Sequence, residues 1–167
     1  MAGITHSFVS GIADGADTTL VRPIDWNATH TGLTIVRKTA DEIVNNSTVL
    51  QNDDHLLFAV AANEVWEIRV AMIVASTAVA DFKYAFTVPT GGAIYAPGGY
   101  TTDSDATIAV AVLYTANQTM STTVAVNRRY IGGANAGNVQ FQWAQNTAEV
   151  SNTKVLANSY IIAHKLA

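Results

Sequence analysis

The chain has 167 residues, a formal net charge of −4 at pH 7 and no cysteine. This length suits a single domain with a sizeable core, and the lack of cysteine excludes disulfide bonds and thiolate metal sites. Charged residues make up 13% of the chain, about half of the roughly 25% that is usual in soluble proteins. Either the surface is rich in Thr, Asn and Gln, or much of it is buried against other subunits.

Charge and hydropathy also exclude two classes of partner. The largest basic clusters are the pairs Arg37-Lys38 and Arg128-Arg129, which are too small for a surface that binds phosphate groups. Apolar runs such as residues 106–114 are much shorter than the roughly 20 residues of a membrane helix. Residues 1–6 lack the basic region and apolar core of a signal peptide. We therefore expect a soluble protein, or a part of a soluble particle, with no nucleic-acid and no membrane partner.

The first 32 residues differ from the rest and predict an extended arm. Neither helical nor two-residue periodicity is sustained across residues 1–32, and Pro23 pushes Arg22 toward extended conformations. The arm carries apolar side chains that must be buried somewhere, either on the same domain or on a neighbouring subunit. These candidate anchors for a partner interface are Phe8, Ile12, Leu20, Val21 and Trp26.

From residue 33 onward, short strands separated by turns follow one another. In residues 64–75 bulky apolar side chains, including Trp66, alternate with polar ones, and residues 81–88 repeat this pattern. A period of two is typical of strands with one buried face. Further strands are expected at residues 34–40, 43–50, 56–60, 93–95, 107–114, 122–130, 138–145 and 155–166. Residues 51–54 are expected to form a turn, and Trp66 and Trp143 are expected in the core.

Eight to ten strands without room for a long helix predict an all-β domain. Because the strands do not alternate with helices, the sheets should be antiparallel. The sequence therefore predicts an antiparallel β-sandwich over residues 33–167, preceded by the arm. A jelly roll is the commonest way to wind this number of strands.

Residues 89–105 form a long, glycine-rich insertion that carries Tyr95 and Tyr100. Long ordered loops in compact domains tend to be functional or interfacial, and tyrosine is favoured at protein contacts. Tyr95 and Tyr100 therefore join the candidate partner interface. A surface loop without a partner is the alternative.

Residues with catalytic or ligating chemistry are scattered through the sequence. The four histidines lie far apart without a metal-ligand spacing, and no nucleophile elbow or phosphate-binding loop is present. Asp53-Asp54 and Asp103-x-Asp105 do not complete a calcium loop. His55 is expected to be a solvated loop residue. We therefore predict no catalytic residues, no metal and no cofactor.

The first half of the chain resembles a known group of proteins. The segments HSFVSGIADGADTTLVRPIDWNATHT (6–31), KTADEIVNNSTVLQNDDHLLFAVAANEVWEIRVAMIVAS (38–76) and DFKYAFTVP (81–89) carry the resemblance. They are similar to small structural proteins of tailed bacteriophages, described variously as tail-fibre, minor structural or capsid decoration proteins. This resemblance implies a virion β-sandwich, assembled in the host cytoplasm, without enzymatic activity.

Two positions in the virion are consistent with this resemblance. A fibre usually has a repetitive or heptad-bearing shaft, and this chain has an arm and one globular domain instead. The resemblance therefore implies a capsid decoration or cement protein that binds over junctions of the major capsid protein as an oligomer, expected to be a homotrimer. The alternative is a tail-fibre or tail-tip component that binds a host receptor or glycan through Tyr95, Tyr100 and the loop 132–137. A hydrolase on a β scaffold would need an acidic cleft, which the scattered Asp and Glu do not indicate.

Overall fold

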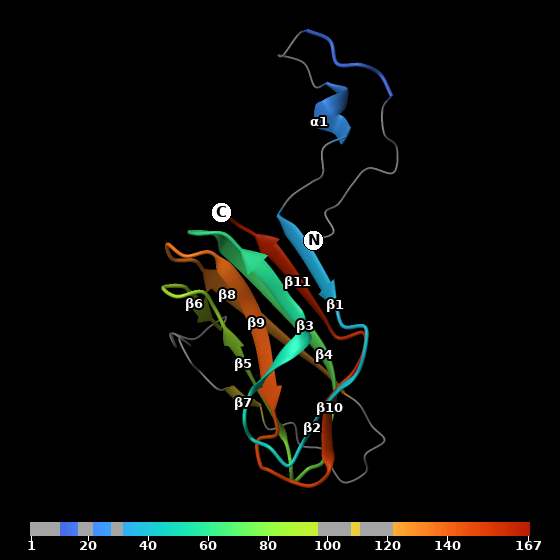
Figure 1. The fold of residues 1–167 in the computed structure, drawn as a ribbon, viewed down its shortest axis with the longest axis vertical. Helices are drawn as coiled ribbons and strands as arrows, with labels where there is room; N and C mark the ends of the chain where they lie inside the picture. Colours follow the sequence, from blue (N-terminus) through green and yellow to red (C-terminus); the bar gives the residue numbers. More distant parts are fainter. Residues whose placement is uncertain (1–10, 17–21, 28–31, 97–107, 111–121) are drawn as a thin grey trace.

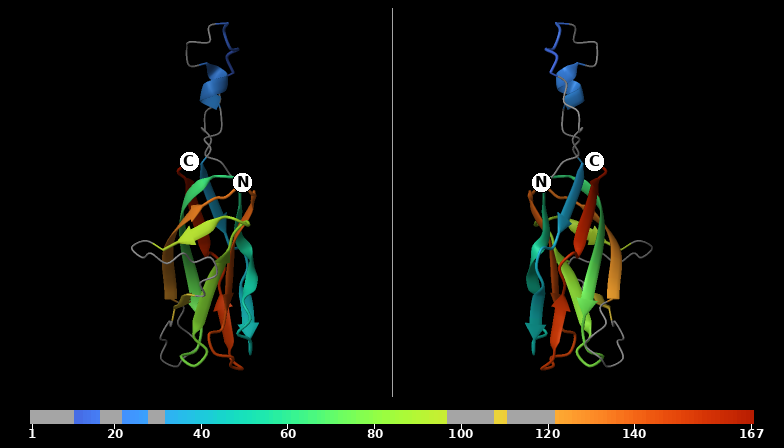
Figure 2. Two further views of the ribbon diagram at one scale, coloured as in Figure 1. Left: turned by 90° about the vertical axis from the view of Figure 1, so that its left-hand side faces the viewer. Right: turned by 90° about the vertical axis from the view of Figure 1, so that its right-hand side faces the viewer.

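The computed structural model describes residues 11–16, 22–27, 32–96, 108–110 and 122–167. Two antiparallel sheets pack against each other, and the described arm residues lie beyond one end of the body (Figures 1 and 2). The prediction of an all-β sandwich is therefore confirmed. Within the described ranges the helix α1 (Pro23–Asn27) has five residues, and no helix there is long and apolar enough to span a membrane.

The first sheet has seven strands and the second has four. The first contains β1 (Leu33–Arg37), β2 (Glu42–Asn45), β4 (Val65–Ala75), β6 (Ala93–Tyr95), β8 (Thr122–Ile131), β10 (Asn152–Val155) and β11 (Tyr160–Lys165). The second contains β3 (Gln51–Val60), β5 (Phe82–Thr87), β7 (Ile108–Val110) and β9 (Gly137–Ala144).

The strand pairing is that of a jelly roll. β1 and β2 pair with β11 and β10, β3 pairs with β9, β4 with β8, and β5 with β7. The first half of the chain thus pairs with the second half in reverse order, like one long antiparallel hairpin rolled into two sheets. β1 and β2 together take one position of the roll, and β10 and β11 together take the position paired with it, so the roll has eight strand positions and β6 adds to its edge.

The core lies between the two sheets and is built from the alternating apolar rows. Trp66 on β4 and Trp143 on β9 are both buried, as the sequence predicts. In the second sheet, the rings of Tyr84 and Phe141 stack with centroids 5.8 Å apart, and Phe86 meets Phe141 edge-on at 5.4 Å. Such aromatic contacts add to the hydrophobic stabilisation of the core, so the sheets form a firm scaffold for the loops at either end.

Two local expectations are wrong. Residues 51–54 do not form a turn but begin β3, whose register with β9 shifts between Asn52 and Leu57. The strand expected at residues 155–166 is interrupted, because Val155 is the last residue of β10 and β11 begins only at Tyr160. The chain turns between them at Asn158, which has a φ of 71°, a conformation that asparagine adopts more readily than most residues.

Within the arm, residues 23–27 are helical. Proline suits the first position of a helix, because the N–H that it lacks would have no partner there. Asp25 Oδ2 accepts a hydrogen bond from Arg22 N at 3.0 Å, which is half of a capping box. Asp14 Oδ1 accepts a second one from Ile24 N at 3.0 Å. The two carboxylates thus cap the start of α1.

Candidate functional site

The end of the sandwich from which the arm departs, here called the arm end, gathers several segments (Figure 1). Lys165 N donates a hydrogen bond to Gly32 O at 2.6 Å, which joins the start of β1 to the end of β11. Gly132 N donates to Glu64 O at 2.8 Å, so the loop before β4 and the loop after β8 also meet there. The arm therefore leaves the body next to a group of ordered loops.

These loops pack closely against each other. A Cβ atom added to Gly133 would lie 2.5 Å from Gly91 O, so the two backbones approach as only glycines allow. Asn135 Nδ2 donates to Thr90 O at 2.8 Å, which fixes the loop 132–136 on the turn after β5. The arm end is therefore a defined surface rather than a set of independent loops.

Tyr95 belongs to the same end. It lies on β6 opposite Arg129, and the row continues through Glu67 and His164 to Leu33 at the base of the arm. With strands about 4.8 Å apart, the row spans roughly 20 Å. Tyr95 and the point where the arm departs thus share one face of the first sheet.

The structure locates part of the predicted interface. Ile12 is 77% exposed, and Ile24, which the sequence reasoning overlooked, is 60% exposed. Tyr95 is half-buried on β6. The side chain of Trp26 and the residues Phe8, Leu20, Val21 and Tyr100 lie outside the described residues. The role of these seven predicted residues in a partner interface stays a prediction.

A second group of reactive side chains lies where β1 is followed by β2. Glu42, Asp53 and His55 offer ligand atoms that all lie within 4.8 Å of one another. Lys38 Nζ lies 2.9 Å from Asp53 Oδ2 and 3.0 Å from Glu42 Oε2, and its side chain is fully buried. The lysine ammonium therefore occupies the place between the carboxylates that a metal cation would need.

Asp53 is the centre of this group, here called the Lys38 cluster (Lys38, Glu42, Asp53 and His55). Its Oδ1 accepts hydrogen bonds from the backbone N–H groups of His55 and Leu56, both at 2.9 Å. Its Oδ2 accepts from Lys38 Nζ and, at 3.2 Å, from Trp143 Nε1. These four donors satisfy the carboxylate and hold the bulge of β3, so the group stabilises the fold.

His55 is not the solvated loop residue that we expected but lies half-buried on β3. Its Nε2 lies 3.0 Å from Thr39 Oγ1, while its Nδ1 lies 3.9 Å from Glu42 Oε1. Hydroxyl, imidazole and carboxylate are the parts of a nucleophile with its base, but 3.9 Å is too long for the hydrogen bond that would orient the imidazole. The geometry therefore does not support an activated Thr39.

Glu42 has an environment consistent with a structural role. Burial raises the pKa of its carboxyl, and hydrogen bonds from Lys38 and from the N–H of Asp54 oppose that rise. Asp54 N donates to Glu42 Oε1 at 2.6 Å. One oxygen of the Glu42 carboxylate thus pairs with the Lys38 ammonium, and the other accepts from the backbone N–H of Asp54.

Comparisons with protein-family models, with curated proteins and with solved structures gave no significant match. The function is therefore argued from the sequence and the geometry above.

Proposed function

We propose that the chain is a non-enzymatic structural protein of a bacteriophage virion. Its most specific role would be that of a capsid decoration or cement protein, which stabilises the head by binding as an oligomer over junctions of the major capsid protein. The observation that carries the proposal is the exposure of apolar side chains on an arm that lies beyond one end of a body with its own packed apolar core.

The arm is suited to contact a neighbouring molecule. Ile24 is 60% exposed on α1, and all described residues of the segment 11–16 are exposed. Full burial of an isoleucine side chain contributes about 1.5–3 kcal/mol, so a few such side chains provide a substantial part of a contact. The residues before Leu33 reach about 100 Å when fully extended, which is enough to cross a neighbouring subunit.

The body supports the proposal through its rigidity and its low charge. A jelly roll with a packed aromatic core presents the arm end as a fixed platform. The side chains with the most reactive chemistry, in the Lys38 cluster, are engaged in ion pairs and backbone hydrogen bonds. A surface with few charges is compatible with burial against other subunits.

The proposal is tested by binding to virus particles that lack the chain. Full-length protein should decorate such particles, and the double variant Ile12→Asp with Ile24→Asp should lose most of this binding while keeping its melting temperature. Val150→Asp is the matched control, because Val150 is 78% exposed on the body and not on the arm. Wild-type protein that does not bind any part of the particle would refute the proposal.

A tail-tip component that binds a host receptor or glycan is the second candidate. It is favoured by one observation, the position of Tyr95 next to the strand that leads into the loop 132–137, since Ala93 pairs with Ile131. In that case Tyr95→Ala should reduce binding to host cells. The Ile12 and Ile24 variant should then leave host binding unchanged.

A further inference from the structure

β1 forms an open edge of the first sheet. Among the described strands it pairs only with β11. Lys165 N donates to Gly32 O and Lys38 N donates to Ser159 O, so the even-numbered residues of this segment bond to β11. Because bonding alternates along an antiparallel strand, the N–H and C=O groups of Leu33, Ile35 and Arg37 point away from β11.

β1 also lacks the devices that usually protect an edge. Natural edge strands are kept from pairing by proline, bulges, charges or very short length. β3 has a bulge and β6 has three residues, whereas β1 reads Leu-Thr-Ile-Val-Arg with its charge at the last position. Ile35 in its centre is 53% exposed. As far as the described residues show, the edge is therefore open to a further strand.

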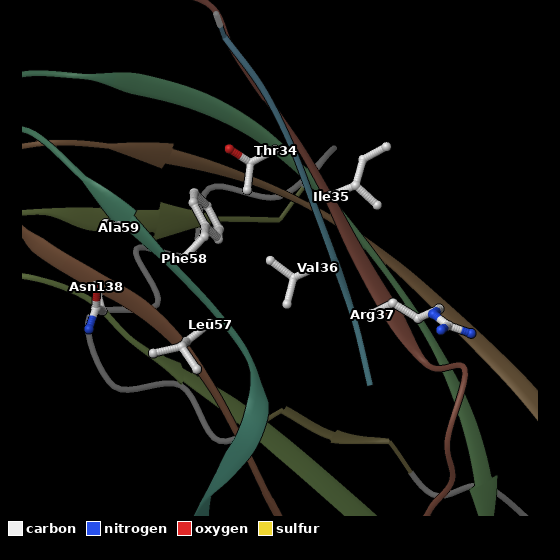
Figure 3. Close-up of a pocket in the computed structure, with 8 residues that line it drawn as sticks. All are labelled: Thr34, Ile35, Val36, Arg37, Leu57, Phe58, Ala59 and Asn138. Carbon is white, nitrogen blue, oxygen red and sulfur yellow. The ribbon is translucent and has the colours of Figure 1, made fainter. Parts of the chain in front are cut away.

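An open groove runs beside this edge. It has a volume of about 520 Å³ and lies between β1 and β3. Figure 3 shows Thr34 and Val36 on the side of β1 that faces β3, with Leu57 and Phe58 across the gap, while Ile35 and Arg37 point the other way. A strand added to β1 would place its inward side chains over this largely apolar groove.

We propose that the strand added to β1 is the β1 of a second copy of this chain, in antiparallel orientation, with a two-fold axis at Ile35. Ile35 then faces the partner's Ile35, and Leu33 faces the partner's Arg37. All outward-pointing backbone groups of Leu33, Ile35 and Arg37 find partners in this register. The interface is isologous, which is the commonest arrangement in homo-oligomers.

Charge and side-chain size select this register and this occupant. A register centred on Arg37 would bring two arginines face to face, which is destabilising. One centred on Leu33 would place Arg37 opposite residue 29 of the partner, before the partner's β1 begins. An axis at Ile35 makes one apolar row across the interface, in which Ile162 and Ile35 are followed by the partner's Ile35 and Ile162. The side chains that enter the groove are then the partner's Thr34 and Val36, which are small enough to fit.

The chain has no cysteine, so a single introduced cysteine reports directly on the axis. In Ile35→Cys the two thiols would stand on facing residues whose Cα atoms are about 5.5 Å apart, within the range of a disulfide. Mild oxidation should give a covalent dimer. Ile43→Cys is the matched control, because Ile43 is 52% exposed on β2 of the same sheet, and it should stay uncross-linked. Equal cross-linking of the two variants, or none at position 35, would overturn the pairing.

A second measurement does not depend on oxidation. Ile35→Lys places two ammonium groups face to face at the axis, while its outward position leaves the core intact. The mass from sedimentation should fall to half of the wild-type value, with an unchanged circular dichroism spectrum. Wild-type protein that is monomeric, or a trimer that keeps its mass in Ile35→Lys, would overturn the inference. The proposed role in the capsid does not depend on this result, because it is tested by particle binding.

Discussion

The buried ammonium of Lys38 provides the most quantitative test of the structure. Its side chain is fully buried and pairs with Asp53, which is equally buried, and with Glu42, whose side chain is 13% exposed. The substitution Lys38→Met keeps most of the volume of the side chain and removes the charge. Two buried carboxylates then lie close together without a cation between them.

The expected loss of stability is large. Removing one partner of a buried ion pair costs about 3–5 kcal/mol, because the remaining charge is buried without compensation. In a protein of this size each kcal/mol lowers the melting temperature by about 2–4 °C, so Lys38→Met should melt roughly 6–20 °C below the wild type. Asp53→Asn should also lower the stability: its amide oxygen can still accept from His55 and Leu56, but its NH2 group would face the donors Lys38 Nζ and Trp143 Nε1.

Urea unfolding followed by tryptophan fluorescence measures this effect, because Trp143 lies in the core and bonds to Asp53. The midpoint should fall while the slope of free energy against urea stays constant. Arg22→Met is the control, since Arg22 and Asp25 form an exposed pair at 3.5 Å that should contribute less than about 1 kcal/mol. A Lys38→Met protein within about 1 kcal/mol of the wild type would refute the account of this cluster.

Three further predictions concern the loops, the pH dependence and metal binding. Gly133→Ala should lower the free energy of unfolding by about 1–3 kcal/mol, because its Cβ would meet the Gly91 backbone at 2.5 Å; an unchanged urea midpoint would contradict this contact. Burial raises the pKa of Glu64, but the ammonium of Lys165 and the N–H groups of Ala61 and Trp66 together hold it below 4.5. Its carboxylate therefore stabilises the fold above pH 4.5 and loses this effect as the pH falls through the lowered pKa. The free energy of unfolding of the wild type should exceed that of Glu64→Gln at neutral pH, and the two values should converge in acid. A difference that stays constant with pH would show that the charge of Glu64 is unimportant. Zinc should leave the melting temperature of the wild type unchanged, because Lys38 occupies the place between the carboxylates, whereas a rise that grows with zinc concentration would indicate a metal site.

The alternating rows made the sandwich predictable from the sequence. Trp66 and Trp143 are surrounded by a period of two, which depends only on neighbouring residues. The start of β3 was missed because Asp53 is typical of turns, and its burial depends on Lys38, which is 15 residues away. The same long-range contact brings His55 close to Glu42, so the Lys38 cluster could not be recognised from spacing.

Other features were missed for different reasons. The start of α1 carries a recognisable signal, since Pro23 suits the first position of a helix and Asp25 can cap it. The same proline pushes Arg22 toward extended conformations, which favours an arm without a helix. The groove beside β1 arises from the winding, which places β1 and β3 at adjacent edges of the two sheets. Only the complete strand order reveals such a surface.

The position and number of copies of the chain in purified virus particles test the central claim most directly. Electron microscopy of particles with gold-labelled protein, combined with gel densitometry against the major capsid protein, measures both. The account predicts label over the whole head and a copy number comparable to that of the shell subunits. Label confined to the tail with few copies, or a chain that is absent from the particles, would contradict it.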